Sequence, residues 1–188
     1  MGTEIHTFGD ASLRAAVSIK GAELVSLTQS DGTELLWNAG PEWRRHSPVL
    51  FPIVGRLPED TATINGKSYH LTQHGFARER GFRRSETTKN GCVLELHEDE
   101  QSLAMFPFRF RLWIAYTISD GELTVRYTVR NPDENRILHA SLGAHPAFRW
   151  PLHPGDVRDE YRLVFEEAEP EPIRRVSGGL LAAAAYPT

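Results

Sequence analysis

The stretch Leu123-Thr124-Val125-Arg126-Tyr127-Thr128-Val129-Arg130 alternates apolar and polar side chains without interruption. Successive side chains of a strand point to opposite faces of a sheet, so this pattern predicts a strand with one apolar face and one face toward water or a cleft. Asp120-Gly121 precedes it, after a second apolar-rich run from Phe110 to Ser119. Both turn residues tolerate positive φ, so residues 110–130 are predicted to form an antiparallel hairpin.

Short apolar runs bounded by Gly, Asp, Asn and Pro continue in both directions from this hairpin, and few windows are long enough for a helix. The strongest turn signal is Asn65-Gly66, between the predicted strands Thr61 to Ile64 and Lys67 to Leu71. The other predicted strands are Glu4 to Phe8, Ala15 to Ile19, Glu23 to Gln29, Glu34 to Leu36, Gly81 to Thr88 and Cys92 to His97. The sequence therefore predicts an all-β protein made of antiparallel hairpins.

Residues 41–58 break this rhythm with four prolines, Pro41, Pro48, Pro52 and Pro58. Proline has no backbone N–H to donate to a central ladder. We therefore expect a long structured loop that lies over the sheet.

Length and composition favour one soluble domain: the chain has 188 residues, of which 40% are hydrophobic and 24% are charged. The formal net charge of -4 gives no basic footprint for nucleic acid or an anionic membrane, so a small ligand is the expected partner. The first twenty residues hold no uninterrupted apolar segment, which argues against a signal peptide or a membrane-spanning helix. The expected location is the cytoplasm. Cys92, the single cysteine, falls in an alternating run and is predicted to be a buried structural thiol.

Three stretches combine His and Arg with aromatic, Gly or Pro residues, a composition typical of binding loops on a rigid scaffold. They are Leu50-Phe51-Pro52-Ile53-Val54-Gly55-Arg56-Leu57, Gln73-His74-Gly75-Phe76-Ala77-Arg78 and Leu142-Gly143-Ala144-His145-Pro146-Ala147-Phe148. Taken singly, the histidines could cap turns and the arginines could be solvated charges. Arg44-Arg45-His46 is interpreted as a solvated face, and the four tryptophans are left unassigned. His70 and His74 have the spacing of a zinc helix, but the Asn-Gly turn before them argues against a helix, so no metal is expected.

In their order and spacing, these stretches resemble the aldose 1-epimerase (mutarotase) superfamily, specifically the branch with the LacX-like proteins and the glucose-6-phosphate 1-epimerases. The resemblance runs from about Gly21 to about Leu181. It implies an antiparallel β-sandwich of the galactose mutarotase-like supersandwich type, with residues 1–188 forming a single domain. The implied activity interconverts the α and β anomers of an aldohexose or a hexose 6-phosphate, without cofactor or metal.

The resemblance also implies roles for five residues. His145 would be the general acid that protonates the ring oxygen, for which the ordinary histidine pKa near 6.5 is suitable. His74 would bind and polarise the same ring oxygen or the C1 hydroxyl. Arg56, Gln73 and Arg78 would hold sugar hydroxyls or a phosphate, which a guanidinium matches in shape.

Family members also carry a glutamate base and a sugar-binding aspartate near their C-terminus, and no residue of this chain maps to either. We therefore expect the chain to stop before the C-terminal strands of the family. It could be an inactive fragment of an epimerase or a carbohydrate-binding module without turnover. Alternatively, a second copy could complete the site, as a homodimer paired through open sheet edges.

Overall fold

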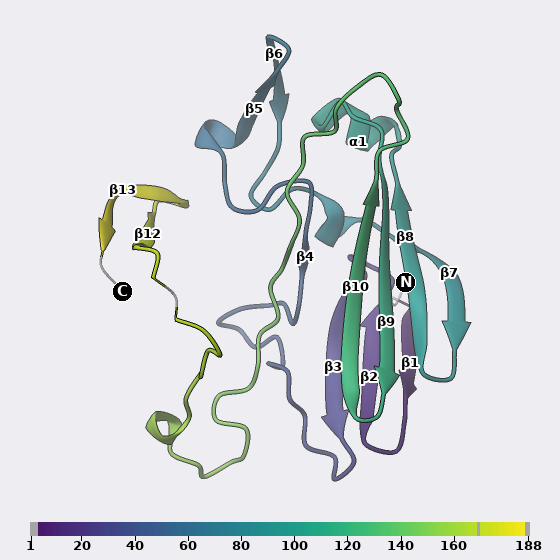
Figure 1. The fold of residues 1–188 in the computed structure, drawn as a ribbon, viewed down its shortest axis with the longest axis vertical. Coiled ribbons are helices and arrows are strands. Elements are labelled where there is room, and N and C mark those ends of the chain that lie inside the picture. The colour runs from purple at the N-terminus through teal and green to yellow at the C-terminus, as the bar shows by residue number, and fades with distance from the viewer. Residues whose placement is uncertain (1–3, 169, 187–188) are drawn as a thin grey trace.

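Two antiparallel sheets built from consecutive hairpins form the body of the computed structural model, which describes residues 4–168 and 170–186 (Figure 1). The first sheet has the order β1-β2-β3, with β1 at Ile5–Gly9, β2 at Leu13–Ser18 and β3 at Glu23–Gln29. The second has the order β10-β9-β8-β7, with β7 at Arg83–Thr88, β8 at Gly91–His97, β9 at Arg111–Ser119 and β10 at Glu122–Arg130. The predicted all-β, antiparallel class is confirmed.

The core lies between the two sheets. On β9, alternate residues are fully or almost fully buried: Leu112, Ile114, Tyr116 and Ile118. They meet Phe8, Val17 and Leu27 of the first sheet in one apolar cluster. The Tyr116 hydroxyl donates to the Ala22 carbonyl at 2.7 Å, which satisfies its one polar group. Burying an aliphatic or aromatic side chain of this size contributes about 1.5–3 kcal/mol, so the alternation in β9 is the main link between the two sheets.

The predicted tight turns are present. Asn65 and Gly66, between β5 (Thr61–Ile64) and β6 (Lys67–His70), both have positive φ, at 50° and 75°. Asp120 and Gly121 have φ of 55° and 76° between β9 and β10. Two successive positive φ angles define the type I′ turn, whose twist suits a two-residue hairpin. Since His70 ends a strand, the interpretation of His70 and His74 as non-helical is also confirmed.

Segment 41–58 differs from the prediction of a loop over the sheet. Its centre forms β4 (Val49–Leu50), which pairs with β11 (Gly143–Ala144), and the flanking Pro48 and Pro52 are fully buried. The prediction of a structured loop holds for most of the segment, but it missed β4 and the burial of the centre because it considered only the missing N–H of proline. The carbonyl of Pro48 accepts from the His145 N–H at 3.2 Å, and that of Pro52 accepts from the Ser141 N–H at 2.9 Å. The centre of the segment, residues 47–52, therefore lies inside the fold, while both ends contain exposed residues.

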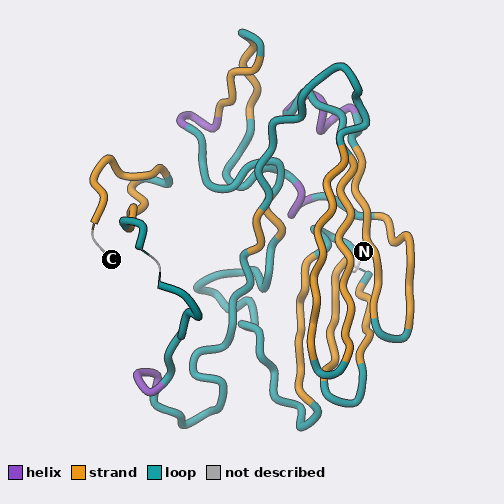
Figure 2. Tube along the Cα trace, in the orientation of Figure 1, coloured by secondary structure: helices purple, strands orange, loops and turns teal. Residues whose placement is uncertain are grey.

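Four further features complete the architecture (Figure 2). The unpredicted helix α1 (Glu100–Met105) begins at a capping box in which Asp99 accepts from the Ser102 N–H. Residues 34–36, predicted as a strand, form only isolated bridges, and the chain ends in the hairpin β12 (Ile173–Ser177) and β13 (Leu180–Tyr186). Short 3₁₀ helices lie at Pro58–Asp60, Ala77–Glu79 and Arg158–Glu160. In the described part of the chain, no helix is long and apolar enough to cross a membrane.

Candidate functional site

Segment 46–55 connects the three stretches that the sequence singled out. On one side it pairs with residues 143–147, through β4 and β11 and through the Ala147 N–H, which donates to the His46 carbonyl at 2.8 Å. On the other side, Phe51 forms a parallel bridge with Gly75, and its carbonyl accepts from the Phe76 N–H at 3.0 Å. The stretches with His74 and His145 are therefore held on the two sides of one central segment.

The turn at His74 and Gly75 has left-handed backbone at both residues, with φ of 66° and 67°. A Cβ on Gly75 would lie 2.4 Å from the Phe51 carbonyl oxygen, so only glycine allows this approach. His74 tolerates its conformation because two hydrogen bonds hold it against Gly55. The His74 N–H donates to the Gly55 carbonyl at 2.8 Å, and the Gly55 N–H donates to His74 Nδ1 at 3.0 Å.

The surroundings of His74 determine its charge, and the bond from Gly55 determines which nitrogen carries the proton. Burial, the largest cause, lowers its pKa below the ordinary value of 6.5, and the positive charges of Arg78, His145 and Arg45 lower it further. The imidazole is therefore neutral at neutral pH. Since Nδ1 accepts from Gly55, the proton of the neutral ring is on Nε2. Nε2 lies 3.3 Å from the side-chain amide of Gln73, whose oxygen must face the ring to accept from the Nε2–H. The same N–H is the group that His74 can offer to a substrate oxygen.

His145 follows β11 directly, and its side chain is exposed to solvent. The indole of Trp43 packs edge-on against its imidazole, with ring centroids 5.2 Å apart and ring planes at 80°. Trp43 is itself held through its carbonyl, which accepts from Trp37 Nε1 at 2.8 Å. The His145 ring is thus oriented on one side and open to a ligand on the other.

Glu23, the first residue of β3, anchors the segment that carries Trp43. Its Oε1 accepts from the N–H groups of His46 and Ser47, at 2.7 and 3.0 Å. The same segment carries Arg45, which forms an ion pair with Glu79. Glu23 therefore holds one arm of the site against the first sheet.

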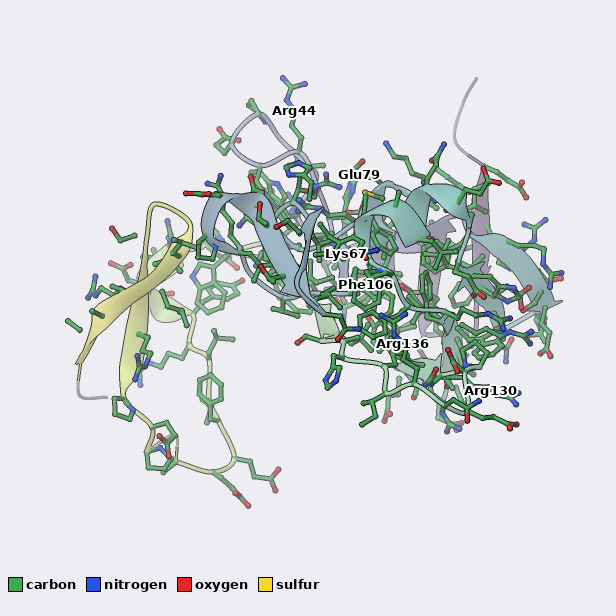
Figure 3. The ribbon with its side chains drawn as sticks, turned by 90° about the horizontal axis from the view of Figure 1, so that it is seen from above. Arg44, Lys67, Glu79, Phe106, Arg130 and Arg136 are labelled. Atoms are coloured by element: carbon green, nitrogen blue, oxygen red, sulfur yellow. The ribbon has the colours of Figure 1, made fainter. Side chains whose placement is uncertain are left out.

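Two arginines lie near His74, and the sequence indicated only one of them. Arg78 Nη2 donates to the Gln73 carbonyl at 2.8 Å, while its buried Nε has no hydrogen-bond partner among the described residues. Burial lowers the pKa of Arg78, as does the nearby charge of Arg45. Arg45 had been interpreted as part of a solvated face, which holds for Arg44, whose side chain points outward (Figure 3). Arg45 was missed, as was Trp43, because no local pattern reveals their contacts with Glu79 and His145.

Arg56 has a different position. Its guanidinium forms a two-point ion pair with Asp60, with Nε to Oδ1 at 2.8 Å and Nη2 to Oδ2 at 3.0 Å. This pairing raises the pKa of Arg56. The structure thus brings His74, Gln73, Arg78 and His145 together around the central segment, while the guanidinium of Arg56 faces Asp60.

Carboxylates are not bonded to the two histidines. Within residues 4–168 and 170–186, neither the His74 nor the His145 imidazole forms a hydrogen bond or an ion pair with an Asp or Glu side chain. In the same residues, no group of three or more His, Cys, Asp and Glu side chains is arranged to hold a metal ion.

Residues 4–167 match the model of the family described as Aldose 1-epimerase. The chain belongs to the aldose 1-epimerase family. It is 32% identical over 155 residues to the LacX proteins of Lactococcus lactis subsp. lactis, plasmid and chromosomal. That match covers 79% of this chain and 52% of LacX, so the chain spans about half the length of the curated relatives it matches.

Solved structures show the same relationship and a galactose mutarotase-like fold. A galactose mutarotase related enzyme from Lactobacillus acidophilus is 30% identical and superimposes with a TM-score of 0.91, over 98% of this chain and 63% of that one. A galactose mutarotase-like protein from Lactobacillus casei is 35% identical, with a TM-score of 0.74, over 77% of this chain and 50% of that one. The resemblance seen in the sequence is therefore confirmed at the level of family and fold.

Proposed function

We propose that this aldose 1-epimerase family chain binds an aldose between His74 and His145 and supplies the acid side of anomer interconversion. The observation that carries the proposal is the placement of two unlike histidines on the two sides of one central segment, residues 46–55. His74 is partly buried, neutral and protonated on Nε2, whereas His145 is exposed and oriented by Trp43. A hydrogen-bond donor beside a titratable acid suits a sugar ring that must open and close.

The proposed reaction consists of proton transfers and one ring bond. A base takes the proton of the C1 hydroxyl, whose electrons form the C1 carbonyl as the bond between C1 and the ring oxygen breaks. His145 gives its proton to the ring oxygen, and His74 Nε2–H stabilises the negative charge that develops there or on the C1 oxygen. The open aldehyde rotates about the C1–C2 bond, and the reverse transfers close the ring on the other face.

The general base of this mechanism is not found among the residues that contact the two histidines. Because no described carboxylate contacts either imidazole, we propose that the base reaches the site from outside the residues seen to surround it. Loss of a positioned base typically reduces a rate by roughly 10²- to 10⁴-fold. The same observation favours a second candidate function, carbohydrate binding without turnover.

The substrate class follows from the charges around His74. Arg45 and Arg78 bring two guanidinium groups beside the imidazole, and Glu79 is paired with Arg45. The Nε of Arg78 is buried and lies 4.0 Å from Glu79 Oε1, so it is the partly exposed remainder of this guanidinium that can donate to a sugar hydroxyl or to a phosphate oxygen. We propose that the chain accepts an aldohexose or its 6-phosphate.

Anomerisation of freshly dissolved α-glucose, α-galactose and α-glucose 6-phosphate, followed by polarimetry, tests both candidate functions. An epimerase accelerates the change above the spontaneous rate. His145→Ala should abolish this acceleration, and His139→Ala, an exposed histidine that packs near Phe108, should retain it. Sugar binding without acceleration would support the binding module, and absence of both from folded protein would contradict both functions.

A further inference from the structure

The side chain of Arg56 is held between a carboxylate and a backbone turn. On one side, Asp60 accepts from Arg56 Nε and Nη2, at 2.8 and 3.0 Å. On the other side lies the turn between β12 and β13, where a Cβ added to Gly179 would be 2.9 Å from Arg56 Cδ. The two neighbours fix the orientation of the guanidinium.

The backbone that carries Asp60 has an uncommon conformation. Glu59 and Asp60 have positive φ, at 54° and 49°, in a region that residues with a Cβ rarely adopt. The Asp60 N–H donates to the Leu57 carbonyl at 3.1 Å, and the Asp60 carbonyl accepts from the N–H of the buried Leu71 at 2.7 Å. Such conformations persist only where the surrounding structure enforces them, and they cluster at ligand sites. The fold therefore holds the Asp60 carboxylate in front of Arg56.

Arg56 also lies beside the proposed sugar site. It directly follows Gly55, whose N–H and carbonyl both bond to His74. The Arg56 side chain is 40% exposed, whereas that of Asp60 is 23% exposed, so the guanidinium is the more accessible partner of the pair. Asp60 occupies one edge of the guanidinium, and within the described residues its remaining N–H groups have no hydrogen-bond partner. These N–H groups are free to bond a ligand.

We propose that Asp60 is a specificity-determining residue, which makes Arg56 favour a neutral sugar hydroxyl over a phosphate group. This inference rests on the proposed function, and it selects the free aldohexose over its 6-phosphate. The remaining N–H groups of Arg56 can bond a hydroxyl, because such a bond needs no net charge. A phosphate at the same groups would also lie close to the Asp60 carboxylate, whose repulsion offsets the attraction of the guanidinium.

The charge balance at Arg56 differs from that at the other arginines of the site. Within the described residues, Asp60 forms a salt bridge with Arg56 alone. This bond is the largest cause that lowers the pKa of Asp60, so its carboxylate is charged at neutral pH. Glu79, in contrast, is shared by three cations, Lys20, Arg45 and Arg78. One carboxylate thus balances one guanidinium at Arg56, and loss of the Asp60 charge should leave a full positive charge there.

Titrations of the unmodified protein and Asp60→Asn with glucose and with glucose 6-phosphate, followed by NMR of the His74 imidazole, test the proposal. Asparagine tolerates positive φ and keeps an oxygen for Arg56, but it has no charge. The variant should increase the affinity for glucose 6-phosphate relative to that for glucose at least about fivefold. An unchanged ratio, or an equal loss of affinity for both sugars, would overturn the proposal, because Asp60 would then at most orient Arg56.

Glu59→Gln is the matched control for charge. It removes one negative charge at the neighbouring residue, which forms no salt bridge within the described part of the chain. The ratio of the two affinities should therefore stay at the value of the unmodified protein. A rise equal to that of Asp60→Asn would overturn the proposal, since the effect would then depend on net charge and not on the pair with Arg56.

Inorganic phosphate is a probe that needs no sugar. Its binding, followed through the Arg56 Nε–H resonance, should be stronger in Asp60→Asn and in Asp60→Gly, which also tolerates positive φ, than in the unmodified protein. Folded variants that both fail to gain phosphate binding would overturn the proposal. A gain of phosphate binding without any binding of glucose would contradict the proposed function but support this role of Asp60, so the two failures are distinguishable.

Discussion

At the scale of single residues, the site depends on how His74 is held. Its imidazole accepts from the Gly55 N–H, and its burial and the neighbouring positive charges lower its pKa and keep it neutral. The unfolded chain exposes the same ring at its ordinary pKa of 6.5, above that of the folded state. The unfolded state therefore binds more protons, and His74 makes folding stability decrease as pH falls through 6.5.

Replacement of His74 tests this linkage. Asparagine tolerates positive φ and offers an oxygen to the Gly55 N–H, but it does not titrate. We expect His74→Asn to lose less unfolding free energy than the unmodified protein between about pH 7.5 and about pH 5.5. Urea denaturation at a series of pH values measures the difference. Parallel pH profiles for the two proteins would show that His74 is not buried in the neutral form.

Gly75 is the residue that allows this turn. Gly75→Ala adds a Cβ at 2.4 Å from the Phe51 carbonyl oxygen, in addition to the cost of a left-handed alanine. Gly66→Ala has the same kind of backbone strain but open space around its Cβ, which makes it a matched control. We expect about 1–2 kcal/mol of destabilisation for Gly66→Ala and clearly more for Gly75→Ala. Equal midpoints in denaturant for the two variants would contradict this account.

Cys92 is buried, as its alternating sequence predicted, and burial raises its pKa to about 11. Only about one thiol in ten thousand is then ionised at pH 7. The thiolate is the reactive form, so folded protein should react with iodoacetamide far more slowly than protein in urea. Similar rates in the two states, followed by mass spectrometry, would rule out a buried thiol.

At the scale of elements, local pattern was informative where a hairpin closes on itself and uninformative where partners are distant. The turns at Asn65-Gly66 and Asp120-Gly121 follow from residue type alone. The strand β4 does not, because its partner is β11, more than ninety residues later. For the same reason, His74 and His145 could be proposed from sequence motifs, whereas Arg45 and Trp43 became visible only through their contacts.

The arm that carries Arg45 and Trp43 depends on one carboxylate. Glu23→Ala removes the acceptor of two part-buried N–H groups, which costs about 1–3 kcal/mol for each group left unsatisfied. Glu23→Gln keeps an acceptor oxygen and should restore most of this stability. Urea denaturation gives the free energies, and near-ultraviolet circular dichroism reports the Trp43 environment. If Glu23→Ala matched the unmodified protein in both, Glu23 would not anchor this arm.

At the scale of the whole molecule, alternation predicted the strands but not how their two sheets pack. The alternation at Leu112 and Ile114 predicts a buried face. The residues that cover this face belong to β1, β2 and β3, which lie far away in the sequence and therefore could not be predicted from the local pattern. The placement of residues 34–37 and 143–149 beside β3 was also not foreseen, because it rests on the single bridges of Glu34 and Leu36. This arrangement keeps the histidine site on the central segment.

The central claim is that the chain binds an aldose between His74 and His145. Nitrogen NMR of the imidazole rings during titration with glucose or galactose tests it most directly, because the chain has 8 histidines and each reports separately. We predict that free His74 shows the signature of a neutral ring protonated on Nε2, and that sugar shifts the signals of His74 and His145 alone. Shifts at other histidines, or none at these two with saturating sugar, would contradict the account.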